Sequence, residues 1–197
     1  MLKLHVGCGD VYLEGYVNIH PAPYGLASFY PEEVEKNKTT VDKYYKDEFG
    51  CKNKKHIADV KACIDDLPTF VSSSSVDEIC MFHVLEHIPQ YDLHKTLNII
   101  VNLLKPNGCF RVAVPDFDAI VIEYASKLNN KISEPDKEWY FRYVYGTQKD
   151  QWSHHYCGYN YNRLTKLLGV CGFNAFQKLP NQNCYPAIHL LAYKGVD

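Results

Sequence analysis

Side chains that could act as acids, bases or metal ligands gather at three places in the sequence. His83, Glu86 and His87 follow an apolar run, and on a helix they would share one face, a spacing that suits metal ligands. His154-His155 lies in an aromatic stretch, where an imidazole could serve as general base for a hydroxyl or be a surface pair. Asp116 ends another apolar run, where it could reach such a hydroxyl or cap a helix.

A glycine pair near the N-terminus predicts a ligand-binding turn. Gly7-Cys8-Gly9 follows the alternating segment 2–6, and glycine lets the backbone turn sharply and a ligand approach it closely. The pair alone is also compatible with an ordinary turn. Val11 and Tyr12 stand where a dinucleotide-binding fingerprint would continue toward its third glycine, and no Gly-Lys-Ser/Thr follows as in a phosphate-binding loop. A nicotinamide-dependent dehydrogenase is therefore disfavoured.

The elements that must position these residues alternate between strand and helix. Hydrophobic periodicity predicts strands at 2–6, 16–19, 56–60, 76–82, 109–114 and 187–193, a further strand opening at 172–173, and helices at 91–104 and 162–168. Gly108, after the first helix, is available for a positive φ. This alternation predicts an α/β fold with a mostly parallel sheet. The segment 179–186 is too short for a helical crossover, so the last two strands are expected to form an antiparallel hairpin.

Composition excludes several functional classes. Of the 197 residues, 46% are apolar, enough to bury a core, and the net charge of −2 gives no overall positive field for nucleic acid. The basic run 52–56 is expected to be a solvated loop, and no stretch approaches the ~20 apolar residues of a membrane span. The eight cysteines contain no Cys-x-x-Cys pair, so we expect reduced thiols. We therefore expect a cytoplasmic protein that neither binds nucleic acid nor spans a membrane.

Several short motifs, in a fixed order, carry a family resemblance. They are Leu4–Asp10, Gly15–Ile19, Asp66–Pro68, Ser75–Ile79, His83–Ile88, Leu104–Gly108 and Val114–Phe117. In this order the chain resembles the class I S-adenosylmethionine-dependent methyltransferases, especially small stand-alone members found with surface-glycan genes. The resemblance is specific over residues 2–118 and looser as far as Lys194. It implies a Rossmann-like, mostly parallel seven-stranded sheet with helices on both faces. It also implies one domain over 1–197, with excursions at 21–55 and 116–160.

The resemblance implies that S-adenosylmethionine lies across the tips of the first four strands. Gly7, Cys8 and Gly9 would run under its methionine part, and His83 would lie near its sulfonium. His20 stands where such proteins usually carry an aspartate that accepts both ribose hydroxyls, whereas a neutral imidazole accepts only one hydrogen bond.

A second departure concerns the adenine. Cys63 stands where the family usually places an aspartate that meets the adenine amino group, although the N–H of Ile64 could still meet the ring. Asp59 and Asp65 are near enough in sequence to substitute. These departures keep open an alternative, in which the chain is a binding module that retains the fold and has lost turnover.

The leading hypothesis is O-methylation of a small-molecule or glycan hydroxyl, with His154, His155 or Asp116 as the assisting base. In the family that the chain resembles, Glu86 and His87 orient the turn after the fourth strand, so we expect no metal ion and activity that survives chelation. Five aromatic residues could stack on a sugar or pack in the core: Tyr140, Phe141, Tyr143, Tyr145 and Trp152.

Overall fold

The computed structural model describes residues 1–9, 13–21, 58–128, 133–149, 152–181, 183 and 185–196. Its strands are β1 (Lys3–Val6), β2 (Val17–His20), β3 (Val60–Lys61), β4 (Val76–Phe82), β5 (Leu104–Pro115), β6 (Phe173–Leu179) and β7 (Ala187–Lys194). Its helices are η2 (Ile64–Thr69), η3 (Leu85–His87), α3 (Leu93–Leu103), α4 (Phe117–Leu128), α5 (Glu134–Tyr145) and α6 (Tyr161–Val170), of which the η helices are short 3-10 helices. Within these described ranges, no helix has both the length and the apolar character needed to cross a bilayer.

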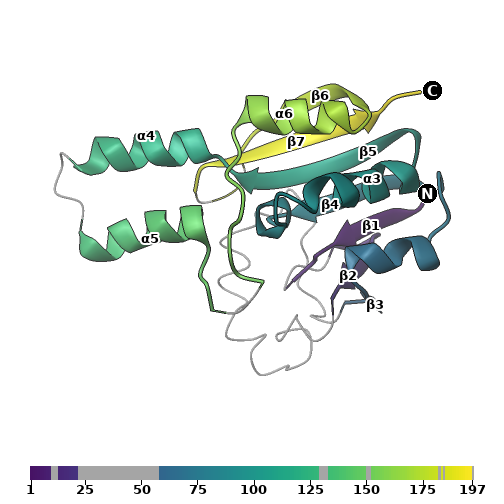
Figure 1. Ribbon diagram of the computed structural model, residues 1–197, viewed down its shortest axis with the longest axis horizontal. Helices are drawn as coiled ribbons and strands as arrows, with labels where there is room; N and C mark the ends of the chain where they lie inside the picture. Colours follow the sequence, from purple (N-terminus) through teal and green to yellow (C-terminus); the bar gives the residue numbers. More distant parts are fainter. Residues whose placement is uncertain are drawn as a thin grey trace.

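The strands form one seven-stranded sheet in the order β3-β2-β1-β4-β5-β7-β6. The first five strands along the chain pair in parallel, and β7 is antiparallel to both β5 and β6. This topology confirms the predicted mostly parallel sheet with an antiparallel C-terminal hairpin (Figure 1). Because β1 to β4 run the same way, their carboxyl ends meet at one edge of the sheet, where ligands bind in open α/β sheets.

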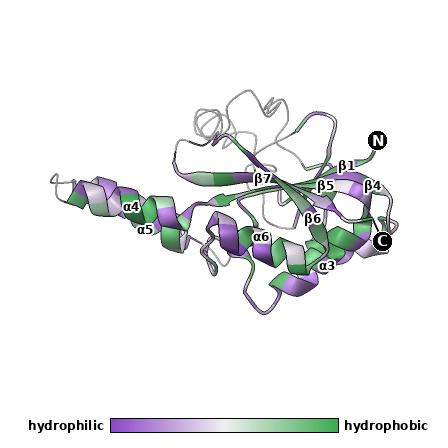
Figure 2. Cartoon of the chain, turned by 90° about the horizontal axis from the view of Figure 1, so that it is seen from above, coloured by the Kyte–Doolittle hydropathy of each residue, from purple (hydrophilic) through white to green (hydrophobic). Residues whose placement is uncertain are grey.

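Both faces of the sheet are apolar at the second half of β4, which explains its unbroken hydrophobic run Ile79–Phe82. Ile79 and Met81 belong to the large core cluster, which also contains the inward face of α3, and Figure 2 shows α3 and α6 on the same side of the sheet. Cys80 and Phe82 point to the opposite face and pack with Leu13. A strand buried on both faces cannot alternate between apolar and polar residues, because neither face meets water.

The turn between α3 and β5 differs from the prediction. Asn107, not Gly108, adopts the positive φ, at 60°. Gly108 is needed for a different reason, because a Cβ at this position would lie 2.8 Å from the Lys105 carbonyl oxygen. β5 also begins at Leu104, earlier than the predicted 109, since its first residues continue the extended backbone from the end of α3.

The second excursion, 116–160, contains a helical pair that the sequence pattern did not separate. α4 and α5 lie side by side and project from the body of the sheet (Figures 1 and 2). The Ser133 side chain caps α5, and α5 ends at Gly146, whose φ is 78°. The first excursion, 21–55, lies outside the described residues except for residue 21. The predicted strand at 56–60 is also described only from residue 58, and its strand there is β3.

Candidate cofactor and acceptor site

The loop after β1 is a tight turn fixed to the neighbouring strand. Gly7 and Gly9 have positive φ values of 72° and 51°. The N–H groups of Gly7 and Cys8 both donate to the carbonyl of Ile19 in β2, at 2.9 and 3.0 Å. A Cβ on Gly7 would lie 2.6 Å from Cγ2 of Val84, whereas a Cβ on Gly9 would meet no described atom within 4 Å. Gly7 thus serves packing, whereas the described residues leave space beside Gly9 at the carboxyl edge of the sheet.

His20 ends β2 and is bonded to this loop. Its Nδ1 accepts a hydrogen bond from the N–H of Gly9 at 3.1 Å. Burial lowers the pKa of His20 to about 4, so the ring is neutral near pH 7. A neutral ring that accepts at Nδ1 carries its proton on Nε2, and this buried Nε2 has no hydrogen-bond partner among the described residues. The acceptor nitrogen of His20 is thus engaged by Gly9, and the proton that remains on the ring lies on the buried Nε2.

Cys63 and Ile64 lie after β3, at the same edge of the sheet. Cys63 precedes η2, and its N–H donates to the carboxylate of Asp66 at 2.9 Å. Ile64 is the first residue of η2, and the first N–H groups of a helix have no acceptor within that helix. The two neighbouring carboxylates are engaged elsewhere: Asp59 accepts from the backbone N–H of Asn18, and Asp65 pairs with Lys95.

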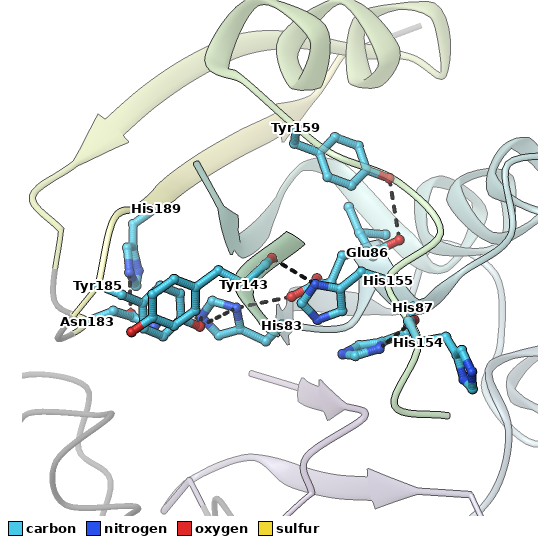
Figure 3. A network of polar contacts seen from close by, with 11 residues as sticks. His83, Glu86, His87, Tyr143, His154, His155, Tyr159, Asn183, Tyr185 and His189 are labelled. Atoms are coloured by element: carbon cyan, nitrogen blue, oxygen red, sulfur yellow. Dashed lines mark hydrogen bonds and ion pairs between the residues drawn. The ribbon is translucent and has the colours of Figure 1, made fainter. Parts of the chain in front are cut away.

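His83 follows β4 directly and has a left-handed backbone conformation, with φ at 54°. This conformation is rare outside glycine and clusters at functional sites. Its Nδ1 lies 3.1 Å from Oε1 of Glu86, and its Nε2 lies 2.7 Å from the amide nitrogen of Asn183. The amide oxygen of Asn183 accepts from His189 Nε2 at 2.7 Å. Four side chains therefore form one polar network that joins β7 to η3 (Figure 3).

The directions of these hydrogen bonds fix the protons of His83. Because the Asn183 oxygen accepts from His189, the Asn183 amide N–H group donates to Nε2 of His83. His83 Nδ1–H then donates to Glu86. The Tyr185 hydroxyl also lies 3.0 Å from His83 Nδ1, so His83 is held between two elements that are far apart in sequence.

Glu86 is a fully buried carboxylate surrounded by histidines. Burial alone would raise its pKa, but the hydrogen bond from His83 and the electrostatic attraction of the surrounding histidines together outweigh burial and lower it. The rings of His87 and His155 meet edge to face with centroids 4.7 Å apart. Burial lowers the pKa of His155, against the opposing effect of Glu86, which favours the neutral imidazole.

Main-chain hydrogen bonds place His155 beside Glu86, although the two residues are 69 positions apart in the sequence. The N–H groups of Tyr156 and Cys157 both point to the carbonyl of Glu86, at 2.7 and 3.4 Å. The N–H of His155 donates to the carbonyl of Tyr145, at the end of α5. Gly146 allows this close return, because a Cβ there would lie 2.0 Å from the carbonyl oxygen of Ser153.

A pocket of about 340 Å³ opens beside these histidines. Its lining comes from α5, the returning segment, η3 and the β6–β7 connection: His87, Trp139, Arg142, Tyr143, Gly146, Thr147, Trp152, Ser153, His155 and Tyr185. Tyr143 and Tyr185 stack at 4.6 Å between centroids, and the Tyr185 hydroxyl reaches His83. The pocket therefore adjoins the carboxyl end of β4 through Tyr185.

Comparison with known proteins agrees with this architecture. The family model described as "Methyltransferase domain" matches residues 4–112, more than half of the chain. The chain belongs to this methyltransferase family. It is a class I S-adenosylmethionine-dependent methyltransferase, as the order of its motifs predicted. A search of curated protein sequences finds no match.

Solved structures share the fold of this methyltransferase at low sequence identity. A SAM-dependent methyltransferase of Thermotoga maritima is 15% identical, with a TM-score of 0.57 and coverage of 98% of this chain and 81% of that one. The 1,6-didemethyltoxoflavin-N1-methyltransferase of Burkholderia thailandensis, with bound S-adenosylhomocysteine, is 13% identical, with a TM-score of 0.51 and coverage of 99% and 71%. The CurJ carbon methyltransferase is 14% identical, with a TM-score of 0.53 and coverage of 100% and 49%. These neighbours methylate different kinds of atom, so the likeness supports the fold and leaves the acceptor open.

The three predicted bases of the methyltransferase lie in different settings. Only His155 lines the pocket. The ring of His154 is turned away from Glu86 (Figure 3), although its carbonyl accepts from Nδ1 of His87 at 3.0 Å. Asp116 adopts the capping role, since its Oδ1 accepts from the N–H of Ala119 in α4 at 3.3 Å.

The aromatic residues of the second excursion fall into three groups, which line the pocket, are buried between helices, or are exposed. Tyr143 and Trp152 line the pocket, together with Trp139. Tyr140 is buried between α4 and α5, where its hydroxyl bonds Glu123. Phe141 and Tyr145 do not line this pocket and are exposed.

Sequence reasoning missed Asn183 and Tyr185. Both lie in a short polar connection between β6 and β7, and no local pattern distinguishes them from ordinary turn residues. Their importance comes only from their contacts with His83, about a hundred positions earlier in the chain.

Proposed function

We propose that this methyltransferase transfers the methyl group of S-adenosylmethionine to a hydroxyl group of a small molecule or a glycan-borne sugar. The observation that carries the proposal is the aromatic pocket beside His83 and His155, next to the strand tips where the cofactor is expected. Its volume of about 340 Å³ is at the lower end of the range for small-ligand sites. We also propose that residues 1–197 form one domain, in which the second excursion, 116–160, contributes most of the acceptor pocket.

The carboxyl edge of the sheet fits the cofactor. The open space at Gly9 leaves room for a ligand against the backbone, with Gly7 and Cys8 holding the turn beneath it. The Nε2–H of His20, which has no hydrogen-bond partner within the described ranges, would donate to a ribose hydroxyl oxygen. The region of Cys63 and Ile64 would meet the adenine, with the first N–H of η2 as donor. His83 would border the methyl end.

The pocket suits an acceptor that is both apolar and polar. Trp139, Tyr143 and Trp152 offer ring faces on which the C–H face of a sugar or a flat ring can stack. Arg142 lies over the Trp139 ring, at 5.2 Å from its centroid, and adds hydrogen-bond donors at the pocket wall.

None of the six described cysteines forms a disulfide, which supports a reaction in a reducing, intracellular compartment.

Methyl transfer to a hydroxyl needs alignment and a place for the hydroxyl proton. When bound, S-adenosylmethionine supplies a methyl group activated by its sulfonium. The protein's part is to hold the hydroxyl in line and to exclude water, which account for much of the acceleration in two-reactant reactions. His155 faces the pocket and donates Nδ1–H to the Tyr143 carbonyl at 3.0 Å, so its neutral ring presents a basic Nε2.

The test begins with the cofactor. S-Adenosylmethionine at a hundredfold excess over its dissociation constant should stabilise the protein by ~2.7 kcal/mol. Gly9→Val should abolish the resulting shift in melting temperature, because its side chain fills the open space at the sheet edge. Gly15→Val is the matched control, since Gly15 also has a positive φ and open surroundings but precedes β2 at the other end of the sheet.

The second arm tests the acceptor. Hydroxyl-bearing sugars and small phenols are offered with labelled cofactor, and Trp152→Ala should raise KM for the acceptor while leaving cofactor affinity unchanged. Cofactor binding without methyl transfer to any oxygen, nitrogen or carbon acceptor would support the binding-module alternative. Transfer only to nitrogen or carbon would refute the proposed hydroxyl acceptor.

A further inference from the structure

Three potential metal ligands converge at the inner wall of the pocket. One ligand atom from each of Glu86, His87 and His155 lies within 4.8 Å of the other two. This set differs from the one that the sequence spacing suggested. His83 has a left-handed backbone and its ring is engaged with Asn183 and Glu86, whereas His155 arrives from the distant returning segment.

His87 and His155 are each oriented by a hydrogen bond from Nδ1 to a backbone carbonyl, as metal-bound imidazoles usually are. His87 Nδ1 lies 3.0 Å from the carbonyl oxygen of His154, and His155 Nδ1 lies 3.0 Å from that of Tyr143. A carbonyl only accepts, so Nδ1 carries the proton and Nε2 of the neutral ring carries the lone pair. Metal-ligating histidines almost always donate their other ring N–H to a carbonyl or carboxylate, which fixes the tautomer and the ring orientation.

Glu86 supplies a buried oxygen that the described part of the chain leaves without a hydrogen bond. Its Oε1 accepts from His83, but its Oε2 has no hydrogen-bond partner among the described residues, and the residue is only 1% exposed. An unpaired carboxylate oxygen away from water carries a desolvation penalty that a protein normally relieves by pairing or by metal coordination. A cation between Glu86 and the two rings would satisfy this oxygen.

We propose that Glu86, His87 and His155 bind one divalent transition-metal ion, with Zn²⁺ as the expected occupant. Two imidazoles and one carboxylate are the ligands of a known class of catalytic zinc site, whereas Mg²⁺ prefers oxygen ligands. Metal–ligand bonds of about 2.0–2.2 Å require the three atoms to draw together by about 1 Å. Three protein ligands leave an open position, and the pocket lined by His87 and His155 is where it would face.

The role of this ion rests on the proposed function. An acceptor hydroxyl in the pocket could occupy the open position. Coordination would then lower the pKa of this hydroxyl toward neutral values. With Nε2 of His155 acting as a ligand, the coordinated hydroxyl would lose its proton to water in the pocket. Its oxygen would then form the new bond to the methyl carbon as the methyl–sulfur bond breaks and S-adenosylhomocysteine leaves. The site also favours acceptors that carry a second oxygen next to the methylated one, because such groups can chelate the ion.

The test measures metal binding without an acceptor. The protein is stripped with a chelator and titrated with Zn²⁺ by calorimetry and with Co²⁺ by visible absorption, which reports the coordination geometry of the bound ion. We expect one ion per chain. His155→Ala should weaken binding roughly a hundredfold or more, since loss of even an outer-shell partner costs 10- to 100-fold. His154→Ala is the matched control, an adjacent histidine whose ring faces away, and it should keep the parent affinity. Glu86→Gln, which keeps an acceptor for His83, should also weaken binding.

Cofactor affinity and melting temperature, measured in the absence of metal, show that each variant is folded. A folded parent protein that binds no Zn²⁺ or Co²⁺ overturns the metal proposal and leaves the proposed function intact. Equal losses in His154→Ala and His155→Ala also overturn it. Stoichiometric metal with no hydroxyl methylation refutes the proposed function instead, while the site itself stands. If the metal site and the proposed function both hold, chelation should abolish methyl transfer and Zn²⁺ should restore it, contrary to the expectation from the sequence that activity survives chelation.

Discussion

The close contact between Gly7 and Val84 predicts that Gly7→Ala destabilises the protein without cofactor. The new Cβ would lie 2.6 Å from Cγ2 of Val84, well inside van der Waals contact, on a backbone with φ at 72°. A left-handed conformation costs an ordinary residue about 1 kcal/mol, and overpacking typically adds about 2 kcal/mol. The free energy of unfolding should therefore fall by about 3 kcal/mol, which lowers Tm by roughly 6–12 °C in a chain of this size.

Gly9→Ala is the control that separates the two costs. Gly9 lies two positions later with φ at 51°, but its Cβ would meet no described atom within 4 Å. Gly9→Ala should therefore lower the free energy of unfolding only by the cost of the left-handed backbone, about 1 kcal/mol. Urea unfolding at pH 7 without cofactor measures both variants, and linear extrapolation gives each free energy.

A double-mutant cycle then tests the contact itself. Val84→Ala removes both Cγ atoms and leaves only its Cβ, 3.5 Å from the new Cβ at Gly7. The pair Gly7→Ala, Val84→Ala should recover about 2 kcal/mol relative to the sum of the single changes. Additive single effects, or equal losses in Gly7→Ala and Gly9→Ala, would refute the reasoning.

Two further predictions concern His20, the last residue of β2, and His5, which is buried in β1. His20→Asp keeps an acceptor for the Gly9 N–H and adds a second oxygen for the ribose, so calorimetry should show about fivefold tighter S-adenosylmethionine binding, worth ~1 kcal/mol, whereas His20→Ala should weaken it. Burial lowers the pKa of His5 from 6.5 to about 4. Only the unfolded chain binds this proton between those pH values. His5 alone therefore lowers the free energy of unfolding by about 3 kcal/mol as the pH drops from 6.5 to 4, and it has no such effect above 6.5. Urea titrations across this range should show a smaller loss for His5→Gln, and an unchanged slope in that variant would contradict the assignment.

The features that the sequence determined alone are those set by neighbouring residues. The apolar run of β4, the stripe on α3 and the glycines at positions 7 and 9 are readable because periodicity and backbone handedness are local properties. Their order along the chain carried the family resemblance, and with it the sheet and the cofactor edge. Even there, the hydrogen bonding of His20 was not readable, because the Gly9 N–H that occupies its acceptor nitrogen comes from the loop after β1, eleven positions earlier in the chain.

The tertiary structure decided which side chains share the acceptor pocket. His154 and His155 are adjacent and chemically identical in sequence, and only the main-chain hydrogen bonds of residues 155–157 to Tyr145 and Glu86 determine which ring faces inward. The assumption of one helical face at residues 83–87 failed because His83 is left-handed and η3 begins only at Leu85. Contacts between residues 69 to 102 positions apart depend on how strands and returning loops pack, and no short-range pattern in a single chain encodes that packing.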